Sequence, residues 1–130
     1  MKAKTKTWLE LACNDLAFAK EILANKKRPY YVAHFCHQAI EKLLKAIVQE
    51  TTDDIPLRTH NLKALCQQAG IDLPLERLQW IVDITPHYLG TKYPEDISVL
   101  YRHYTLAFAR KLYRETEEFF QWLQKTFQLA

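Results

Sequence analysis

The sequence predicts an all-α protein, an up-and-down bundle of four to five helices. Only two glycines, Gly70 and Gly90, occur among its 130 residues, which is too few for an architecture of tight β-turns. Apolar residues make up 48% of the chain and recur every three or four positions. The expected connections are short, so the helices should pack as antiparallel neighbours. We expect one domain over residues 1–130.

The first expected helix covers about residues 5–23. Thr7 and Glu10 have the spacing of a capping box at its start. The basic turn at residues 25–29 ends it, and Pro29 suits the first turn of the next helix. One apolar stripe runs along the helix and consists of Trp8, Ala12, Leu16, Ala19 and Leu23.

The second expected helix covers about residues 30–49, and a short third helix follows a loop. Thr59 predicts the N-cap of the third helix, and Gly70 predicts its C′ position. The buried stripe of the second helix is Val32, Phe35, Ala39, Leu43, Ala46 and Ile47. The inner face of the third is Leu62, Leu65, Cys66 and Ala69.

A fourth helix is expected after residue 73, with Pro74 in its first turn. Pro86 should kink or end it, because proline lacks a donor and clashes with the preceding turn. Residues 90–94 then form a turn, and Asp96 or Ser98 caps a final helix of ~45 Å that runs to about Phe127. The inward residues of the fourth helix are Leu75, Leu78, Ile81, Val82 and Thr85. Those of the last are Tyr101, Thr105, Phe108, Leu112, Thr116, Phe119, Leu123 and Phe127.

Composition narrows the class of protein. A net charge of +3 falls short of the basic excess of a dedicated nucleic-acid binder, and two glycines cannot build a glycine-rich phosphate loop. Cys13, Cys36 and Cys66 contain no Cys-x-x-Cys pair, so we expect buried, reduced thiols and a cytoplasmic protein. The first residues resemble neither a signal peptide nor an anchor. No apolar run approaches the roughly 18 residues of a membrane helix.

The second helix carries the densest polar set: His34, His37, Gln38, Glu41, Lys42 and Lys45. Helical spacing places His34, Gln38 and Glu41 on one side. Glu41 should pair with Lys45 and hold a ring N–H of His37, four residues away on either side. The set is interpreted either as a groove that binds an anion or nucleotide, or as a solvated helix face with ordinary ion pairs.

Metal and nucleophile chemistry have weaker support. His37 and Glu41 have usable spacing for zinc, but Cys36 points about 100° away around the helix, and the sequence offers no clear third ligand. We therefore expect no metal and no cofactor. There is one serine, Ser98, and no nucleophile-elbow motif.

Two loop features extend the candidate site. His60 follows Thr59 in what is otherwise an ordinary helix start. Lys92 and Tyr93 lie between Gly90 and Pro94, before a helix N-terminus whose N–H groups suit an anion; the alternative is a turn whose Tyr93 packs on the core.

The helices also carry more aromatic residues than one apolar stripe requires, which suggests a homodimer. These are Tyr30, Tyr31, Tyr101, Tyr104, Phe120 and Trp122.

Four segments together resemble the HEPN domain family. The second helix has the run HQAIEKLLKA at residues 37–46, similar to the family's Gln-Ala-x-Glu-Lys-x-x-Lys-Ala signature. NDLAFA at residues 14–19 resembles the family's first helix, and THNLKAL at residues 59–65 resembles its Thr-His-x-Leu-x-x-Leu element. Residues 92–94, KYP, stand where the family usually has Arg-Tyr-Pro. The matches follow the expected order and span nearly the whole chain.

This resemblance implies a helical bundle, usually dimeric, that binds nucleotide or RNA in a cleft. It also implies a prokaryotic protein that acts with a minimal nucleotidyltransferase as a toxin–antitoxin pair. Many HEPN proteins are metal-independent ribonucleases, marked by an Arg followed four to six residues later by a His near the start of the last long helix.

The sequence departs from that ribonuclease mark. Lys92 replaces the usual Arg, and no His follows it or Arg102 at the required spacing. His103 lies too far along, and Arg28 with His34 has the spacing but flanks the second helix. Cleavage needs an acid or base near the 2′-hydroxyl and a cation on the phosphate. The candidates for these roles are His37, His60, His87 and His103, with Lys92 or Arg102. We therefore expect a binding module; a ribonuclease with a degenerate motif and a purely structural interaction bundle are the alternatives.

Overall fold

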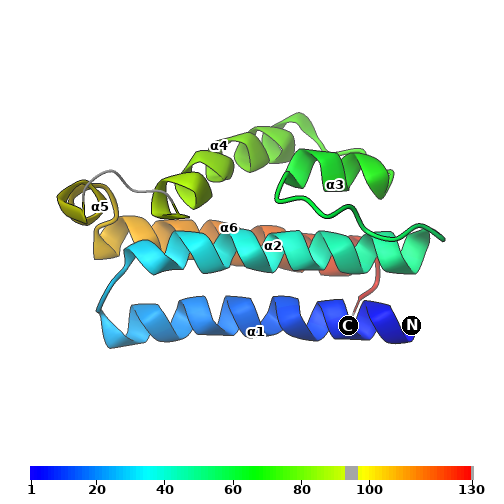
Figure 1. The fold of residues 1–130 in the computed structure, drawn as a ribbon, viewed down its shortest axis with the longest axis horizontal. Helices are drawn as coiled ribbons and strands as arrows, with labels where there is room; N and C mark the ends of the chain where they lie inside the picture. Colours follow the sequence, from blue (N-terminus) through cyan, green and yellow to red (C-terminus); the bar gives the residue numbers. More distant parts are fainter. Residues whose placement is uncertain (93–96, 130) are drawn as a thin grey trace.

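The chain folds as a bundle of antiparallel helices (Figure 1). A computed structural model describes the backbone of residues 1–92 and 97–129, and the side chains of these residues except 88–92. Within them lie six helices and no strand: α1 (Ala3–Asn25), α2 (Tyr30–Thr51), α3 (Leu62–Gln68), α4 (Leu75–Lys92), α5 (Ile97–His103) and α6 (Leu106–Thr126). The predicted all-α bundle is confirmed, with six helices in place of the expected five.

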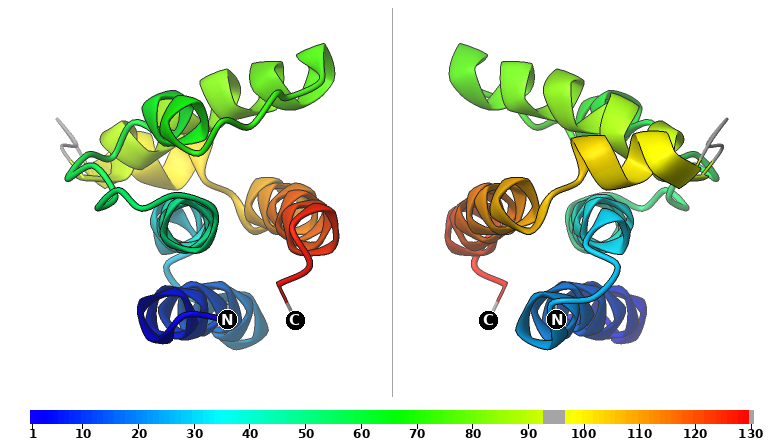
Figure 2. Two further views of the ribbon diagram at one scale, coloured as in Figure 1. Left: turned by 90° about the vertical axis from the view of Figure 1, so that its right-hand side faces the viewer. Right: turned by 90° about the vertical axis from the view of Figure 1, so that its left-hand side faces the viewer.

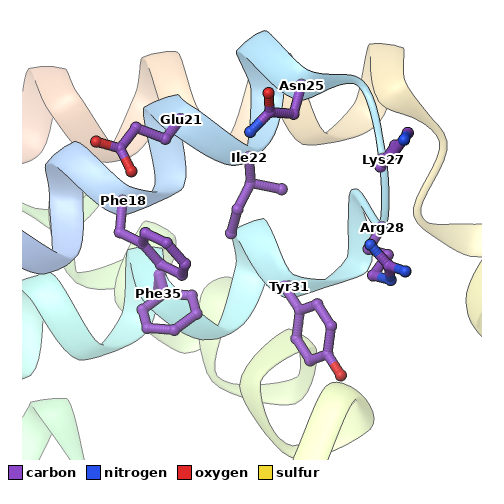
Figure 3. A pocket seen from close by; sticks show the side chains of 8 residues that line it. All are labelled: Phe18, Glu21, Ile22, Asn25, Lys27, Arg28, Tyr31 and Phe35. Atoms are coloured by element: carbon purple, nitrogen blue, oxygen red, sulfur yellow. The ribbon is translucent and has the colours of Figure 1, made fainter.

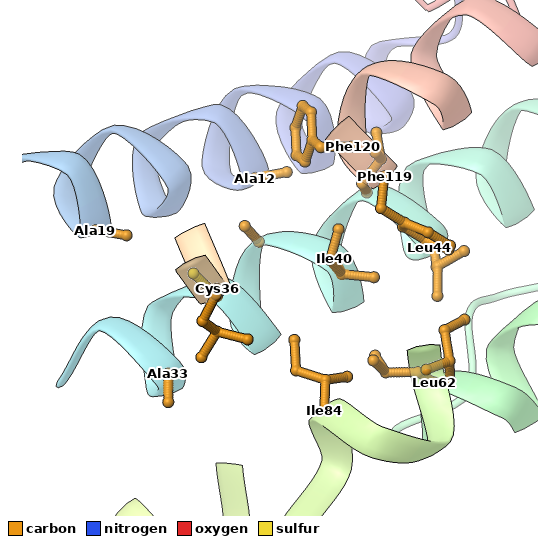
Figure 4. Close-up of a cluster of buried hydrophobic side chains, with 14 of the residues drawn as sticks. Ala12, Ala19, Ala33, Cys36, Ile40, Leu44, Leu62, Ile84, Phe119 and Phe120 are labelled. Carbon is orange, nitrogen blue, oxygen red and sulfur yellow. The ribbon is translucent and has the colours of Figure 1, made fainter. Parts of the chain in front are cut away.

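Helix α2 is the central element. Seen end-on, α1 lies on one side of it, α3 and α4 lie on the opposite side, and α6 lies beside it (Figure 2). Thirteen of the 22 residues of α2 are buried. Ile40 and Leu44 extend from α2 toward Leu62 of α3 and Ile84 of α4, with Phe119 of α6 beside them (Figure 4). Burial of this apolar surface is the main stabilising contribution to the fold.

The expected single helix after residue 96 is in fact two helices. Thr105 has an extended backbone conformation (ψ 162°) and its hydroxyl accepts a hydrogen bond from the N–H of Phe108 at 3.2 Å. It is therefore the N-cap of α6 and not a member of a continuous stripe. Tyr101, also assigned to that stripe, is 57% exposed on α5. The prediction failed because threonine supports both a helical interior and a cap.

Helix α4 does not stop at Pro86. It continues through Lys92, so of the two outcomes expected at Pro86, a kink or an end, the end is excluded, and the turn expected from Gly90 is wrong over residues 90–92. Its phase also differs, because among the described side chains of α4 Ile81 and Ile84 are buried while Val82 is half exposed. Leu75, expected to face inward, is 81% exposed.

The helix ends differ in detail from the expectation. α1 begins at Ala3, and the Thr7 hydroxyl donates to the Ala3 carbonyl instead of forming a capping box. α3 is capped by Asn61, whose side chain accepts from the N–H of Ala64, and not by Thr59. The predicted C′ glycine is confirmed, since Gly70 has φ +70°.

The cysteines are not all buried as expected. Cys36 and Cys66 are buried, and burial raises the pKa of each thiol to about 12. Cys13 is exposed, because it lies on the outer side of α1. Among the described residues, no helix is both long enough and apolar enough to cross a bilayer.

Several of the aromatic side chains that suggested a dimer are buried within a single chain. Tyr30, Tyr104 and Phe120 are buried in the bundle, whereas Tyr31 and Tyr101 are about half exposed. Tyr30 contacts both exposed tyrosines, with ring centroids 4.7 Å and 5.7 Å away. The surface on which the homodimer expectation rested is therefore smaller than the sequence suggested, and the homodimer stays a prediction.

Candidate functional site

The polar residues of α2 centre on one buried carboxylate. Glu41 is 3% exposed. One of its oxygens lies 2.7 Å from His60 Nδ1, and the other accepts a hydrogen bond from Lys45 Nζ at 3.2 Å. A buried carboxylate requires such partners, because water no longer stabilises its charge. The expected pairing of Glu41 with Lys45 is present, and His60 is recruited from 19 residues away.

His37, one helical turn before Glu41 on α2, is fully buried. Its Nδ1 is 4.0 Å from Glu41 Oε1, beyond hydrogen-bonding distance. Burial lowers the pKa of His37 to about 3, and nearby His60 and His34 add to the lowering. The ring is therefore neutral at physiological pH and shielded from a substrate.

The two signature lysines face α1. Lys42 Nζ lies 2.6 Å from the Asp15 carboxylate on α1, and both side chains are partly buried. Lys45, besides its bond to Glu41, lies 5.3 Å from the centre of the Trp8 ring, within cation–π range. Both cations thus stabilise the contact between α1 and α2.

One side of α2 remains uncovered by any other helix. α6 lies on the opposite side, and of the described segments the loop that carries His60 crosses this side (Figure 2). Helical spacing sets His34 and Gln38 along it in line with Glu41, and both are partly exposed. We call this surface the polar edge of α2; it is formed by His34, Gln38, Glu41, Lys45 and His60, with Lys42, four residues after Gln38, at its border with α1.

The structure describes only part of the predicted turn at residues 92–94. The last turn of α4, at Lys92, lies at the end of the bundle where α2 begins (Figure 1). Tyr93 and Pro94 lie outside the described residues, as does the Lys92 side chain. Convergence of Lys92 and Tyr93 with the polar edge therefore stays a prediction.

A second cluster of candidates lies where α5 meets α6. His87 and His103 line the same hollow of about 330 Å³, together with Tyr104 and Phe108. His87 Nδ1 is 3.0 Å from the Tyr104 hydroxyl. Burial lowers the pKa of His87 and His103 adds to this, whereas Asp83 opposes it. Arg102 is exposed in the last turn of α5 and does not line this hollow.

The break between α5 and α6 is what brings these two histidines together. Both residues are candidates from the sequence, but a single helix continued through Thr105 does not bring them together. A hollow between α1 and α2 that involves Phe18 and Tyr31 was not predicted. The sequence does contain one indication of this hollow. Phe18 and Tyr31 both fall outside the apolar stripes of their helices, and both lie near the basic turn at residues 25–29.

Metal binding gains no support from the geometry. Over residues 1–92 and 97–129, no three His, Cys, Asp or Glu side chains are arranged to hold a metal ion. His37 and Glu41, the pair with zinc-like spacing, belong to the buried network instead.

The chain is similar in sequence to one known family. A family model described as the HEPN domain matches residues 5–126. The chain belongs to the HEPN domain family. Nothing among curated proteins or solved structures matches it. The family includes nucleotide-related and ribonuclease-like toxin modules, and HEPN domains often form dimers. In this HEPN domain, Glu41 and Lys45 of the run at residues 37–46 pair with each other, and Lys42 of the same run pairs with Asp15 of α1.

The buried histidine predicts a pH dependence of stability. The pKa of His37 is about 3 in the folded protein and 6.5 in its ordinary state. The unfolded chain therefore binds more protons between these values. The free energy of unfolding should fall as pH drops below about 6.5, by up to about 1.4 kcal/mol per pH unit from this group.

Urea unfolding at pH 6.5 and pH 5.0 measures this slope. His37→Gln should reduce this slope, and by more than His103→Gln does, because His37 is buried and His103 is exposed. Equal slopes for wild type and His37→Gln would show that His37 is not the group responsible.

Proposed function

We propose that this HEPN domain is a binding module that pairs with a minimal nucleotidyltransferase, as in a prokaryotic toxin–antitoxin system, and docks it on the polar edge of α2. The observation that supports this most is the state of the signature residues. His37 is buried and neutral, and Glu41 is held by Lys45 and His60. A histidine without access to substrate cannot act as an acid or base.

The polar edge suits a protein partner because its side chains are fixed in advance. Lys45 and His60 are held by Glu41, and Lys42 is held by Asp15. Side chains already ordered lose less conformational entropy when a partner binds. The partly exposed cations favour an acidic surface on the nucleotidyltransferase. A homodimer, and a nucleotide or RNA as a further ligand, remain part of this proposal.

A charge swap tests the docking surface. Lys42→Asp should weaken the complex with a co-expressed minimal nucleotidyltransferase encoded beside the gene, measured by isothermal titration calorimetry, by about tenfold or more. The same change should also lower stability by about 1–3 kcal/mol, because the new carboxylate lies beside Asp15 in a partly buried position.

The double variant Lys42→Asp/Asp15→Lys restores the ion pair within the fold but moves the cation to α1. It should regain thermal stability without regaining partner affinity. Full recovery of affinity would instead show that Lys42 acts only by holding α1 to α2. Absence of any complex between the wild-type protein and the neighbouring nucleotidyltransferase would refute the proposed pairing.

A specific observation supports ribonuclease activity as the second candidate function. His87 and His103 share one hollow near the start of the last long helix, the region where the family's ribonuclease motif lies. If this site cleaves RNA, activity should persist in EDTA, and His103→Ala should reduce it by about 10²-fold or more. His103 is exposed, so the variant should remain folded. RNA left intact by the wild type in EDTA would eliminate this candidate.

A further inference from the structure

A hollow of about 580 Å³ opens between the C-terminal end of α1 and the start of α2 (Figure 3). Its volume falls within the range of small-molecule sites, roughly 300–1,000 Å³. Phe18, Ile22, Tyr31 and Phe35 supply its apolar lining. It is separate from the Glu41 network and from the hollow that contains His87 and His103.

The lining is sorted by chemistry along the hollow. Figure 3 shows Phe18 and Phe35 together at one end and Lys27 and Arg28 at the other, where the turn joins the helices. The Glu21 carboxylate also lines the hollow and lies at the Phe18 end, away from the two cations. The two phenylalanine rings meet edge to face, with centroids 4.7 Å apart. Lys27 and Arg28 are both exposed. An occupant that matches this order has a flat apolar ring at one end and a negative charge at the other.

The aromatic side chains at this hollow are unusually exposed for their size. Phe18 and Tyr31 each have 45% of their surface open to solvent, although most of the chain's other large apolar side chains pack into the core. Exposed aromatic area is costly in water and is recovered when a ligand covers it. The exposed area therefore favours an aromatic occupant over a purely ionic one.

The turn holds its cations in a constrained geometry. Lys26 and Arg28 both have left-handed backbone conformations, with φ of +57° and +53°. Lys26 ends α1, where its N–H bonds to the carbonyls of Ile22 and Leu23, so its conformation has an ordinary capping role. Arg28 has a conformation that favours glycine, yet it places a guanidinium at the edge of the hollow. A backbone conformation that costs free energy for arginine, at the edge of the hollow, points to a use for the guanidinium.

We propose that this hollow binds a small aromatic anion, a planar ring that carries a phosphate or carboxylate. The ring lies against Phe18, Phe35 and Tyr31, and the anionic group pairs with Arg28 and Lys27. A nucleoside monophosphate and an aryl carboxylate share this chemistry, and the experiment below separates them. The proposal is independent of partner docking on the polar edge of α2.

Four probes test the two required features by isothermal titration calorimetry on the full chain. Adenosine monophosphate and 2-naphthoate have both a ring and an anion, whereas adenosine and inorganic phosphate each have one. At least one of the first pair should bind saturably, at least about tenfold more tightly than either single-feature probe. Binding of the monophosphate alone identifies a nucleotide, and binding of 2-naphthoate alone identifies an aryl carboxylate.

Variants locate the binding. Arg28→Gly removes the cation and relieves the positive φ, so it should weaken binding at least about fivefold without loss of thermal stability. Gln128→Gly is its matched control, since Gln128 also has a positive φ (+55°) but no charge and lies beyond α6. Phe18→Leu keeps the apolar volume and removes the ring, and it should also weaken binding. Arg28→Lys should recover part of the lost affinity.

Two results would overturn the proposal. One is the absence of saturable binding by either two-feature probe at millimolar concentration. The other is binding that Arg28→Gly and Phe18→Leu both leave unchanged. Neither result bears on the nucleotidyltransferase complex, which the Lys42 and Asp15 variants test separately.

Discussion

Replacement of Glu41 by glutamine should lower the free energy of unfolding by about 2–4 kcal/mol. The carboxylate is 3% exposed and is shared by Lys45 and His60. Glutamine has nearly the same shape but no charge, so the Lys45 ammonium, whose side chain is 12% exposed, would lose its counter-ion. Removing one partner of a buried pair costs more than the pair itself contributes, because the remaining charge stays desolvated.

Urea unfolding at neutral pH measures this effect. Glu118→Gln is the matched control: Glu118 forms a two-bond pair with Arg77 at 2.9 Å, but its side chain is 65% exposed. Its loss should cost about 1 kcal/mol or less. Similar losses for the two variants would mean that Glu41 is more accessible to water than its burial indicates.

Truncation of Leu44 to alanine should cost about 2–5 kcal/mol. Leu44 is fully buried and extends from α2 into the core shared with α3, α4 and α6 (Figure 4). The cost has two sources, the lost transfer of apolar atoms from water and the cavity that the neighbours cannot close.

Leu75→Ala provides the control with identical chemistry. Leu75 is 81% exposed at the start of α4, so its truncation should change stability by no more than about 0.5 kcal/mol. Thermal and urea unfolding of both variants would give the comparison. A large loss at Leu75 would indicate that this side chain is covered in solution, by a second copy or by another protein.

The fold class and most core residues could be predicted from sequence because helical periodicity reports directly on burial. The stripe of the central helix is an example: Val32, Ala39 and Leu43 are buried as expected. The errors fall where one residue type supports two local structures. Thr105 caps α6 instead of continuing a helix, and Gly90, expected to begin a turn, lies inside α4.

The candidate site was less predictable because its geometry depends on contacts between distant segments. Spacing alone indicated that Glu41 meets Lys45. It could not show that His60 takes the other oxygen, nor that Lys42 turns toward Asp15 on α1. The pairing of His87 with His103 and the hollow beside Phe18 likewise depend on helix packing.

The arrangement of α1 and α2 also has a consequence for how the chain folds. The two helices pack side by side along nearly their whole length and are joined by a turn of only a few residues (Figure 1). Closing so short a loop costs little chain entropy, and contacts between neighbouring segments favour rapid folding. This hairpin can therefore form as an early nucleus. The pairing of α2 with α6 must close a loop of more than fifty residues and would come later.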